Sequence, residues 1–427
     1  MAEATLPTVT RETASKHGSR GLLTIAWRNL WRNRRRTWLT SGGIAFAVWL
    51  LVFAMSMQVG AFDSMIDNGA RLMLGHIQLQ HPLYQDDPRL EYTISVSEQF
   101  LSELESRAGV QVVAPRVQNF ALLSVGERSF GAQVIGVDPA KEAGWSTLAG
   151  KVGEGRYLEG PGEVVLGSVL ARNLATAVGD EVVLLGTAKE GGVAAAVVEV
   201  VGTFSTGIAD LDRGIAQIDI GEFREGWALA EGEVHAVILL ADSVSASERI
   251  AAELAVENDG KQWLVLDWRE LMPEVEQTME LKYVSVQFFF ALIAIIVSFS
   301  VVNTFMMTVF ERTPEFGMLM AVGMRPSAIM LQLLIEAFWL ALLGISLGVA
   351  FSAALLLPLS ATGIPLPEAS AQLLVQFNMP ERMYPGFSLT SVWVASLIML
   401  VGTQFAAIVP ALRIRRMRPV EALRASE

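Results

Sequence analysis

Four long, almost uncharged stretches constrain this chain more than any other feature. About 20 consecutive apolar residues are enough for a helix to cross the hydrocarbon core of a bilayer. Four stretches reach that length, and no other run in the sequence does. They cover residues 39–62, 286–310, 328–357 and 392–412. The sequence therefore predicts an α-helical membrane protein with four transmembrane helices.

A large polar region separates the first span from the second. Residues 63–285 hold about 35 Asp and Glu against about 16 Lys and Arg, which suits a domain that folds in water. Over the whole chain of 427 residues, 52% are hydrophobic and 18% charged. That balance is too apolar for a soluble enzyme and too polar for membrane helices alone. We expect a membrane unit joined to one extracytoplasmic domain.

Strand and helix patterns predict an α/β fold for this domain. Short apolar runs bounded by glycine turns are typical of strands. Residues 76–114 and 234–266 each read as strand, helix and strand, which indicates a weak internal repeat of a βαβ-like unit. We expect a β-rich insert between them, near residues 155–230.

Arginines near the ends of the spans predict the orientation. Lys and Arg are enriched in the cytoplasmic segments of membrane proteins. Arginines cluster just before the first span and just after the fourth, at Arg28, Arg32, Arg34, Arg35, Arg36, Arg413, Arg415, Arg416 and Arg418. Both termini are therefore expected in the cytoplasm, with the large domain outside.

The remaining segments are short. Residues 20–38 place Leu23, Trp27, Leu30 and Trp31 on one helical face, a pattern typical of an amphipathic helix in the membrane interface. We further expect a disordered cytoplasmic tail at 1–19, a cytoplasmic loop at 311–327, an external loop at 358–391 and a basic cytoplasmic tail at 413–427.

Catalytic motifs are absent from the sequence. It contains no GxxxxGK[ST] phosphate loop. It has no cysteine, and its four histidines form no HExxH pair. Asp210, Asp212 and Asp219 do not have the spacing of a calcium loop. The sequence thus predicts no enzyme activity, no metal site and no nucleic-acid partner for this chain.

The loop between the second and third spans has an unusual pattern. Pro314 suits the first turn of a short helix, and Gly323 can end it. Its apolar residues are Phe316, Met318, Leu319 and Met320, flanked by Glu311 and Glu315. A short apolar cytoplasmic helix either docks a protein partner or lies against the membrane. Both interpretations remain open at this point.

Polar residues inside the spans are costly and therefore informative. Glu336 lies within the third span, where we expect it to be protonated or hydrogen-bonded between helices, with gating or ion coupling as the alternative. Asn303 and Gln404 are expected to bond between helices rather than to bind a ligand. Gly344 and Gly348 form a GxxxG pattern, which favours close helix packing.

A methionine-rich and aromatic group marks the outer halves of the first two spans. Flexible Met and aromatic side chains can accommodate acyl chains, although ordinary packing explains them equally well. The candidate substrate or dimer cavity comprises Phe53, Met55, Met57, Val59, Phe62, Phe288 and Phe289.

Taken together, these patterns resemble the FtsX-like permease family, the membrane subunits of MacB-type ABC transporters. The resemblance covers essentially the whole chain. In the loop and third span it rests on Glu311, Arg312, Glu315, Gly317, Leu319, Ala321, Gly323, Ile329 and Glu336. At the ends it rests on Ala26, Arg28, Asn29, Leu30, Arg32, Pro419, Ala422, Leu423 and Arg424.

This resemblance implies partners and a function. It implies a second permease subunit (homo- or heterodimer) and two copies of a separate ATPase that binds ATP-Mg, while this chain binds no cofactor. The coupling residues would be Glu311, Pro314, Glu315, Phe316, Met318, Leu319 and Met320. The external domain would be MacB periplasmic core-like. The layout is most similar to lipoprotein-releasing (Lol-type) permeases of the bacterial inner membrane, which implies membrane lipid and a periplasmic carrier or substrate protein as partners.

Two alternative functions remain. An FtsX-like subunit would relay ATP hydrolysis to a periplasmic partner as a signal and would transport nothing. A small-amphiphile efflux permease would instead work with an outer-membrane duct.

Overall fold

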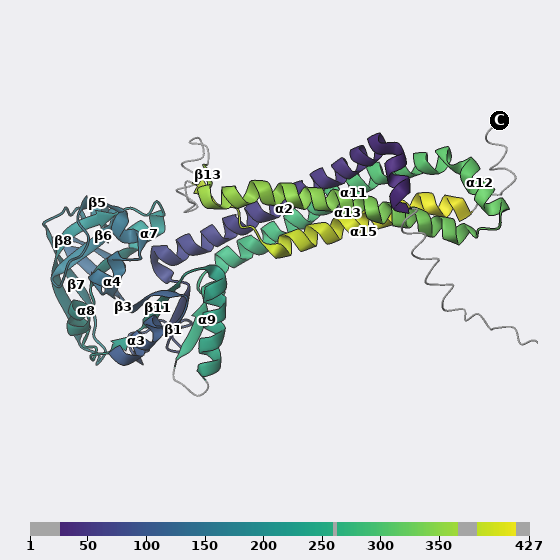
Figure 1. Cartoon of the computed structure of the whole chain (residues 1–427). Coiled ribbons are helices and arrows are strands. Elements are labelled where there is room, and N and C mark those ends of the chain that lie inside the picture. The colour runs from purple at the N-terminus through teal and green to yellow at the C-terminus, as the bar shows by residue number, and fades with distance from the viewer. Residues whose placement is uncertain (1–25, 259–262, 366–381, 416–427) are drawn as a thin grey trace, which may run out of the picture. The chain divides into compact units, whose positions relative to one another are not determined.

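The computed structural model describes residues 26–258, 263–365 and 382–415, which divide into two units (Figure 1). One unit comprises Phe62–Glu280 with Pro365–Met383, and the other comprises the remaining residues. The tail predicted at 1–19 and nearly all of the tail predicted at 413–427 lie outside the described residues. Each unit is described by itself below.

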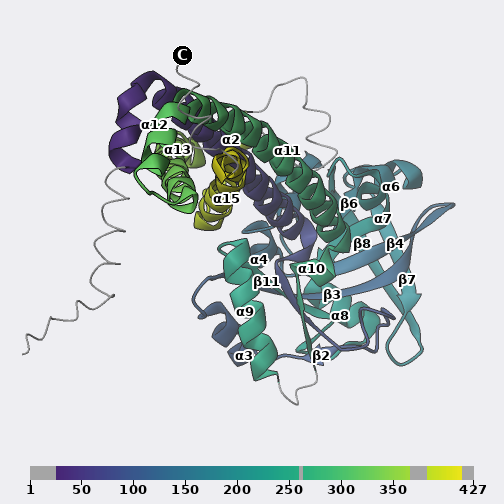
Figure 2. The ribbon, with the colours of Figure 1, turned by 90° about the vertical axis from the view of Figure 1, so that its right-hand side faces the viewer.

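The membrane unit is built from four long helices. They are α2 (Arg34–Gly69), α11 (Pro273–Glu311), α13 (Pro326–Thr362) and α15 (Leu389–Arg415). Each is long and apolar enough to cross a bilayer, and the two views show them running side by side (Figures 1 and 2). Each helix extends beyond the apolar stretch predicted from the sequence, because its flanking polar residues are also helical. The fold class predicted from the sequence is confirmed.

The described part of the segment predicted as an interfacial helix is also helical. It starts at Ala26 and passes through the 3-10 turn η1 (Trp31–Asn33) into α2. Its apolar side packs on protein, because the ring of Trp27 meets that of Trp339 on α13 edge-on at 5.3 Å between centroids.

Glycines allow α13 to approach α2 closely. A Cβ atom at Gly344 would lie 2.8 Å from Ile44, and one at Gly348 would lie 2.6 Å from the carbonyl oxygen of Ala45. Such distances are too short for any side chain, so the GxxxG pattern marks a backbone contact between these two helices.

The external unit contains a four-stranded antiparallel sheet in the order β12–β1–β11–β3. Its strands are β1 (Ile77–Gln80), β3 (Val110–Val125), β11 (Ala236–Ala241) and β12 (Leu264–Asp267). The helices α3 (Glu98–Glu105) and α9 (Val244–Glu257) connect β1 to β3 and β11 to β12. This is a ferredoxin-like arrangement. The two βαβ-like units exist, but each is split by a strand of the other, so its own two strands are parallel and not neighbours.

The inserted part of the external unit closes into a six-stranded barrel. The strands follow the order β3–β4–β9–β6–β8–β7, and β7 returns to pair with β3. They are β4 (Arg128–Val137), β9 (Ile215–Asp219), β6 (Glu163–Gly167), β8 (Val193–Phe204) and β7 (Glu181–Thr187). The insert predicted near 155–230 starts too late, because β3 already enters the barrel at Val117. One 16-residue strand thus belongs to both the sheet and the barrel.

Shorter elements complete the fold. The helices are α4 (Pro139–Ala143), α5 (Thr147–Gly150), α6 (Ser168–Leu174), α7 (Ala209–Gly214), α8 (Ile220–Trp227), α10 (Trp268–Leu271) and α12 (Thr313–Ala321), with a π turn η2 (Ala70–Leu74). The strands are β2 (Ile94–Ser95), β5 (Val152–Gly155), β10 (Glu233–Val234), β13 (Ile364–Pro365) and β14 (Arg382–Met383).

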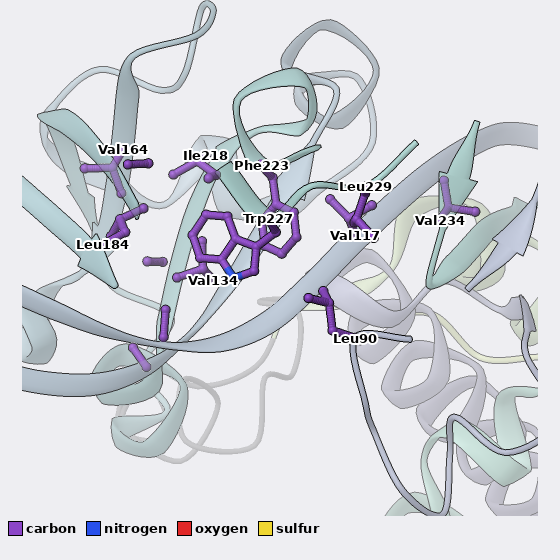
Figure 3. Packing of buried hydrophobic residues seen from close by; sticks show 14 of the residues in the cluster. Leu90, Val117, Val134, Val164, Leu184, Ile218, Phe223, Trp227, Leu229 and Val234 are labelled. Atoms are coloured by element: carbon purple, nitrogen blue, oxygen red, sulfur yellow. The ribbon is translucent and has the colours of Figure 1, made fainter. Parts of the chain in front are cut away.

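Two stacked aromatic rings of α8 fill the barrel core. Phe223 and Trp227 are fully buried, with ring centroids 4.4 Å apart. Figure 3 shows Trp227 among Val134, Val164, Leu184 and Ile218, which come from four barrel strands. Since burial of large side chains dominates folding energetics, this cluster holds the barrel together.

A buried histidine makes the external unit sensitive to acid. His235 is fully buried, its Nδ1 accepts a hydrogen bond from the backbone N–H of Gln118 (3.0 Å), and its Nε2 lies 3.2 Å from the carbonyl oxygen of Leu90. The neutral ring with its proton on Nε2 satisfies both contacts. Burial therefore lowers the pKa of His235 to about 4.

We predict that the external unit loses stability as the pH falls from about 6.5 to about 4. In this window the unfolded chain binds a proton at residue 235 and the folded chain does not. One pKa unit corresponds to about 1.4 kcal/mol, so we expect His235 to account for a loss of about 2–3 kcal/mol. The measurement is the urea midpoint for proteolytic protection of this unit at pH 7 and pH 4. His235→Asn should show a smaller pH dependence than the wild type; an equal dependence contradicts the assignment.

Candidate coupling site

The loop between α11 and α13 folds into the short helix α12. Pro314 stands in its first turn, where the missing N–H costs nothing. The helix ends at Ala321, and Gly323 follows its C-cap with a φ of +103°, in the left-handed region that favours glycine. The backbone N–H of Met324 then bonds the carbonyl of Leu319 at 2.9 Å. Both helix signals read from the sequence act as predicted.

The two faces of α12 differ sharply in exposure. Phe316 is only 1% exposed and belongs to the core of the membrane unit, whereas Met318 is 61% and Val322 85% exposed. Leu319 and Met320 are partly buried against the same core. The ring of Phe316, a predicted coupling residue, is thus enclosed by the chain's own core, and its role in coupling stays a prediction. The exposed apolar face is made by Met318 and Val322.

A buried ion pair lies directly behind α12. Nη1 of Arg312 is 3.0 Å from both carboxylate oxygens of Glu336 on α13, and both residues are at most 7% exposed. Glu336 also accepts hydrogen bonds from Asn29 (2.7 Å) and Gln332 (3.4 Å). Of the two structural alternatives for Glu336, interhelical bonding is the one observed.

Two further ion pairs connect the same loop to residues 26–36, the helical segment formed by η1 and the start of α2, which we name the N-terminal helix. Arg32 lies 3.0 Å from Glu315, and Arg36 lies 2.7 Å from Glu311. Glu315 also accepts a bond from Nε of Arg312 at 3.1 Å. Burial raises the pKa of Glu315, but the hydrogen bonds from Arg32 and Arg312 outweigh burial and lower it overall. Glu311 and Glu315, predicted as docking residues, are thus engaged within the chain while remaining about half exposed.

Sequence reasoning did not find Asn29, Arg32 and Arg36 as parts of this site. Arg32 and Arg36 are four residues apart and therefore lie on one side of a helix. The spacing could have indicated that the two arginines act together. It could not have identified their acidic partners, which lie about 275 residues further along the chain.

The candidate cavity residues differ in how far they are buried within the chain. Phe53 and Met55 pack against the core of the membrane unit, while Met57 and Val59 are half-buried and Phe62 is buried. On α11, Phe288 and Phe289 are exposed. The structure therefore assigns two of the seven to packing and leaves two on an open face.

Asn303 and Gln404 do not show the predicted bonds between helices. Asn303 is exposed on α11, and its side chain forms no hydrogen bond within the described residues. Nε2 of Gln404 is buried and has no partner among the described residues. The prediction is wrong for Asn303 within one chain because its side of α11 is not covered by another helix of the unit.

The two units correspond to two known families of domain. The model of the MacB-like periplasmic core domain matches residues 37–256, which is more than half of the chain. The model of the FtsX-like permease C-terminal domain matches residues 287–419. The chain therefore belongs to the FtsX/MacB-type permease family. It is a permease subunit of an ABC transporter and a bacterial inner-membrane protein.

Individual relatives support this membership. The transmembrane protein LolC of a lipoprotein-releasing system from Xylella fastidiosa (strain 9a5c) is 26% identical over 397 residues, covering 90% of this chain and 92% of the relative. LolC from Neisseria meningitidis serogroup B is 24% identical and covers 73% and 75%. The macrolide export ATP-binding/permease protein MacB 1 of Yersinia pestis bv. Antiqua (strain Antiqua) is 28% identical over 187 residues, which are 42% of this chain and 25% of that protein.

Two solved structures with detectable similarity are external domains. The extracellular domain of the noncanonical ABC-type transporter YknZ from Gram-positive bacteria covers 45% of this chain, with 15% identity and a TM-score of 0.33. The periplasmic region of MacB from Actinobacillus actinomycetemcomitans covers 48%, with 15% identity and a TM-score of 0.34.

We predict that Arg312 and Glu336 are strongly coupled in stability. Removing one partner of a buried ion pair leaves an uncompensated charge and costs about 3–5 kcal/mol, whereas replacing both with apolar residues is often close to neutral. Arg312→Met and Glu336→Leu should therefore each lower the thermal midpoint in detergent more than the double variant does. Additive losses in this double-mutant cycle would show that the pair contributes little.

Proposed function

We propose that this subunit transmits movement from a separate ATPase to its external domain, and that this movement releases lipoproteins or related amphiphiles from the inner membrane. The observation that carries the proposal is the construction of α12. Its outer face is apolar and exposed at Met318 and Val322, and its inner face is fixed to the bundle by Phe316 and the ion pairs of Arg312.

Such a helix is suited to receive force. A push on the exposed face of α12 is opposed by directional contacts, because Arg312 bonds Glu315 and Glu336 at 3.0–3.1 Å. Charge-assisted hydrogen bonds of this kind are stronger than neutral ones and depend on geometry. Movement of α12 would therefore be passed to α13 through Glu336 and to the N-terminal helix through Arg32.

Orientation and partners follow from the same proposal. The basic segments at both ends favour a cytoplasmic location for the termini and for α12. We propose two copies of a separate ATPase, each binding ATP-Mg, below a pair of permease subunits. The apolar residues Met318 and Val322 would be buried in that interface, where apolar side chains contribute most when fully covered.

Lipoproteins are the substrate class favoured by the relatives. The LolC proteins of Xylella fastidiosa and Neisseria meningitidis align over 90% and 73% of this chain and are named for lipoprotein release. The MacB relatives align over less than half of this chain. A periplasmic carrier that accepts the released lipoprotein would complete the system.

The docking part of the proposal predicts a difference between the two faces of α12. Met318→Asp and Val322→Asp should leave expression and the thermal midpoint close to wild type, because both side chains are exposed, but should reduce co-purification of the ATPase at least about tenfold. Phe316→Asp should instead unfold the membrane unit, because it places a carboxylate in the core. Normal ATPase binding by both exposed-face variants would contradict the docking role of α12.

The substrate part predicts that release depends on acylation. Proteoliposomes containing the chain, its ATPase and a lipoprotein should deliver the acylated protein to a soluble carrier when ATP is added. The matched control is the same protein without its lipid anchor, attached to the proteoliposome by an artificial tether. Its ATP-dependent release from the membrane is measured in the same way. Equal release of both forms, or none of the acylated form while ATP is hydrolysed, would exclude lipoprotein release.

A further inference from the structure

The end of α2 enters the external unit through an unusual turn. The backbone N–H of Gly75 bonds the carbonyl of Ala70 at 2.8 Å, five residues back, so η2 is a π turn. Gly75 has a φ of +69°, and a Cβ atom there would lie 2.4 Å from a methyl carbon of Ile238. Only glycine fits this position. The helix therefore passes directly into β1 without a flexible linker.

Four side chains of the external unit receive the carbonyl groups at this helix end. The last carbonyls of a helix have no partners within it and must be satisfied from elsewhere. Here each of four consecutive carbonyls accepts one side-chain bond: Thr147 to Arg71 (3.5 Å), Ser146 to Leu72 (3.3 Å), Arg116 to Met73, and Gln78 to Leu74 (2.6 Å). We name Gln78, Arg116, Ser146 and Thr147 the carbonyl clamp.

Arg116 is the central member of the carbonyl clamp. It is 3% exposed, it bonds Met73 and the buried carboxylate of Glu142 on α4, and its guanidinium lies 5.1 Å from the ring of Trp145. A cation is favourable at a helix C-terminus because of the helix dipole. A buried ion pair, however, seldom adds stability over a well-packed apolar pair. This points to a geometric role for Arg116.

Arg116 also lies where the two halves of the external unit meet. It pairs with Ala236 of the antiparallel sheet, and the next residue, Val117, pairs with Gly136 of the barrel. A displacement of the end of α2 would therefore reach the sheet and the barrel through the same residue.

The beginning of α11 contacts this region differently. Val275 and Met279 of α11 pack against an apolar cluster made by Ile66 of α2, Trp268 of α10 and Met272. A Cβ atom at Gly69 would lie 2.6 Å from the sulfur of Met272. Apolar contacts are not directional, whereas hydrogen bonds to carbonyls are. Of these two connections, the clamped end of α2 is the one that fixes an orientation.

We propose that the carbonyl clamp is the joint through which α2 turns the external unit, and that Arg116 is its positioning residue. The proposal rests on the proposed function, because it requires ATP-driven movement of α2. Sheet and barrel then follow the helix end as one body, so that work done at α12 appears outside the membrane. Without the clamp, the same movement of α2 would deform the turn η2 and would not move the external unit.

The test is a distance measurement in the full complex with the ATPase. The natural chain has no cysteine, so Glu127→Cys on the β3–β4 hairpin and Tyr283→Cys on α11, both exposed, can carry spin labels without other changes. The variant is Arg116→Met with Glu142→Leu, which removes the clamp's central bond but keeps an apolar core of similar volume. We expect the nucleotide-dependent distance change to fall at least about fivefold while ATP hydrolysis stays within about twofold of wild type.

The control removes a second Arg–Glu pair, which is more exposed and lies away from the joint. Arg107→Met with Glu257→Leu eliminates a bidentate pair between the turn after α3 and the end of α9, and should keep the full distance change. Arg116→Lys should restore part of the movement, because it retains a cationic donor. A full distance change in the Arg116/Glu142 variant overturns the proposed role of the carbonyl clamp but leaves the proposed function intact. No distance change in the wild-type complex during ATP hydrolysis overturns the proposed function and the clamp with it.

Discussion

The buried ion pair between Arg312 and Glu336 is the constraint on which the arrangement of the membrane unit depends. Taking two charges out of water is costly, and the cost is recovered only where further hydrogen bonds complete the geometry. Asn29, Gln332 and Glu315 provide those bonds. The pair can therefore form only when the end of α11, the helix α12, α13 and the N-terminal helix occupy fixed places. The exposed face of α12 is defined as a consequence.

The sequence predicted the elements of the fold far better than their pairing. Membrane spans and strands follow from length and periodicity, which are local. Strand order is not local: β1 pairs with β11 and β12, more than 150 residues away, so the two βαβ-like units interlock in a way that no window of sequence reveals. The sequence pattern ends the first βαβ-like unit at residue 114, because Pro115, Arg116 and Gln118 interrupt the apolar pattern of β3. The structure shows that Arg116 is polar because it serves the carbonyl clamp.

The candidate site was predicted by residue type but not by face. The short helix α12 and its ends at Pro314 and Gly323 could be read directly, whereas the burial of Phe316 could not, because a nine-residue helix shows two apolar sides and only its neighbours decide which is covered. Likewise, an interhelical bond for Glu336 could be expected from the cost of an exposed charge in a membrane. Its partner Arg312 could not be chosen among several nearby arginines.

A buried Arg–Glu ion pair occurs at two helix ends, one where movement would enter the subunit and one where it would leave. Arg312 and Glu336 fix the place where force would enter, and Arg116 and Glu142 fix the place where it would leave. Apolar residues could fill either position at similar stability, but they would not define a direction. A guanidinium donates its hydrogen bonds in the plane of a rigid fork, so it resists rotation as well as separation. A subunit that transmits movement needs this property at both ends of the path, since a rigid helix between two loose joints would transmit nothing.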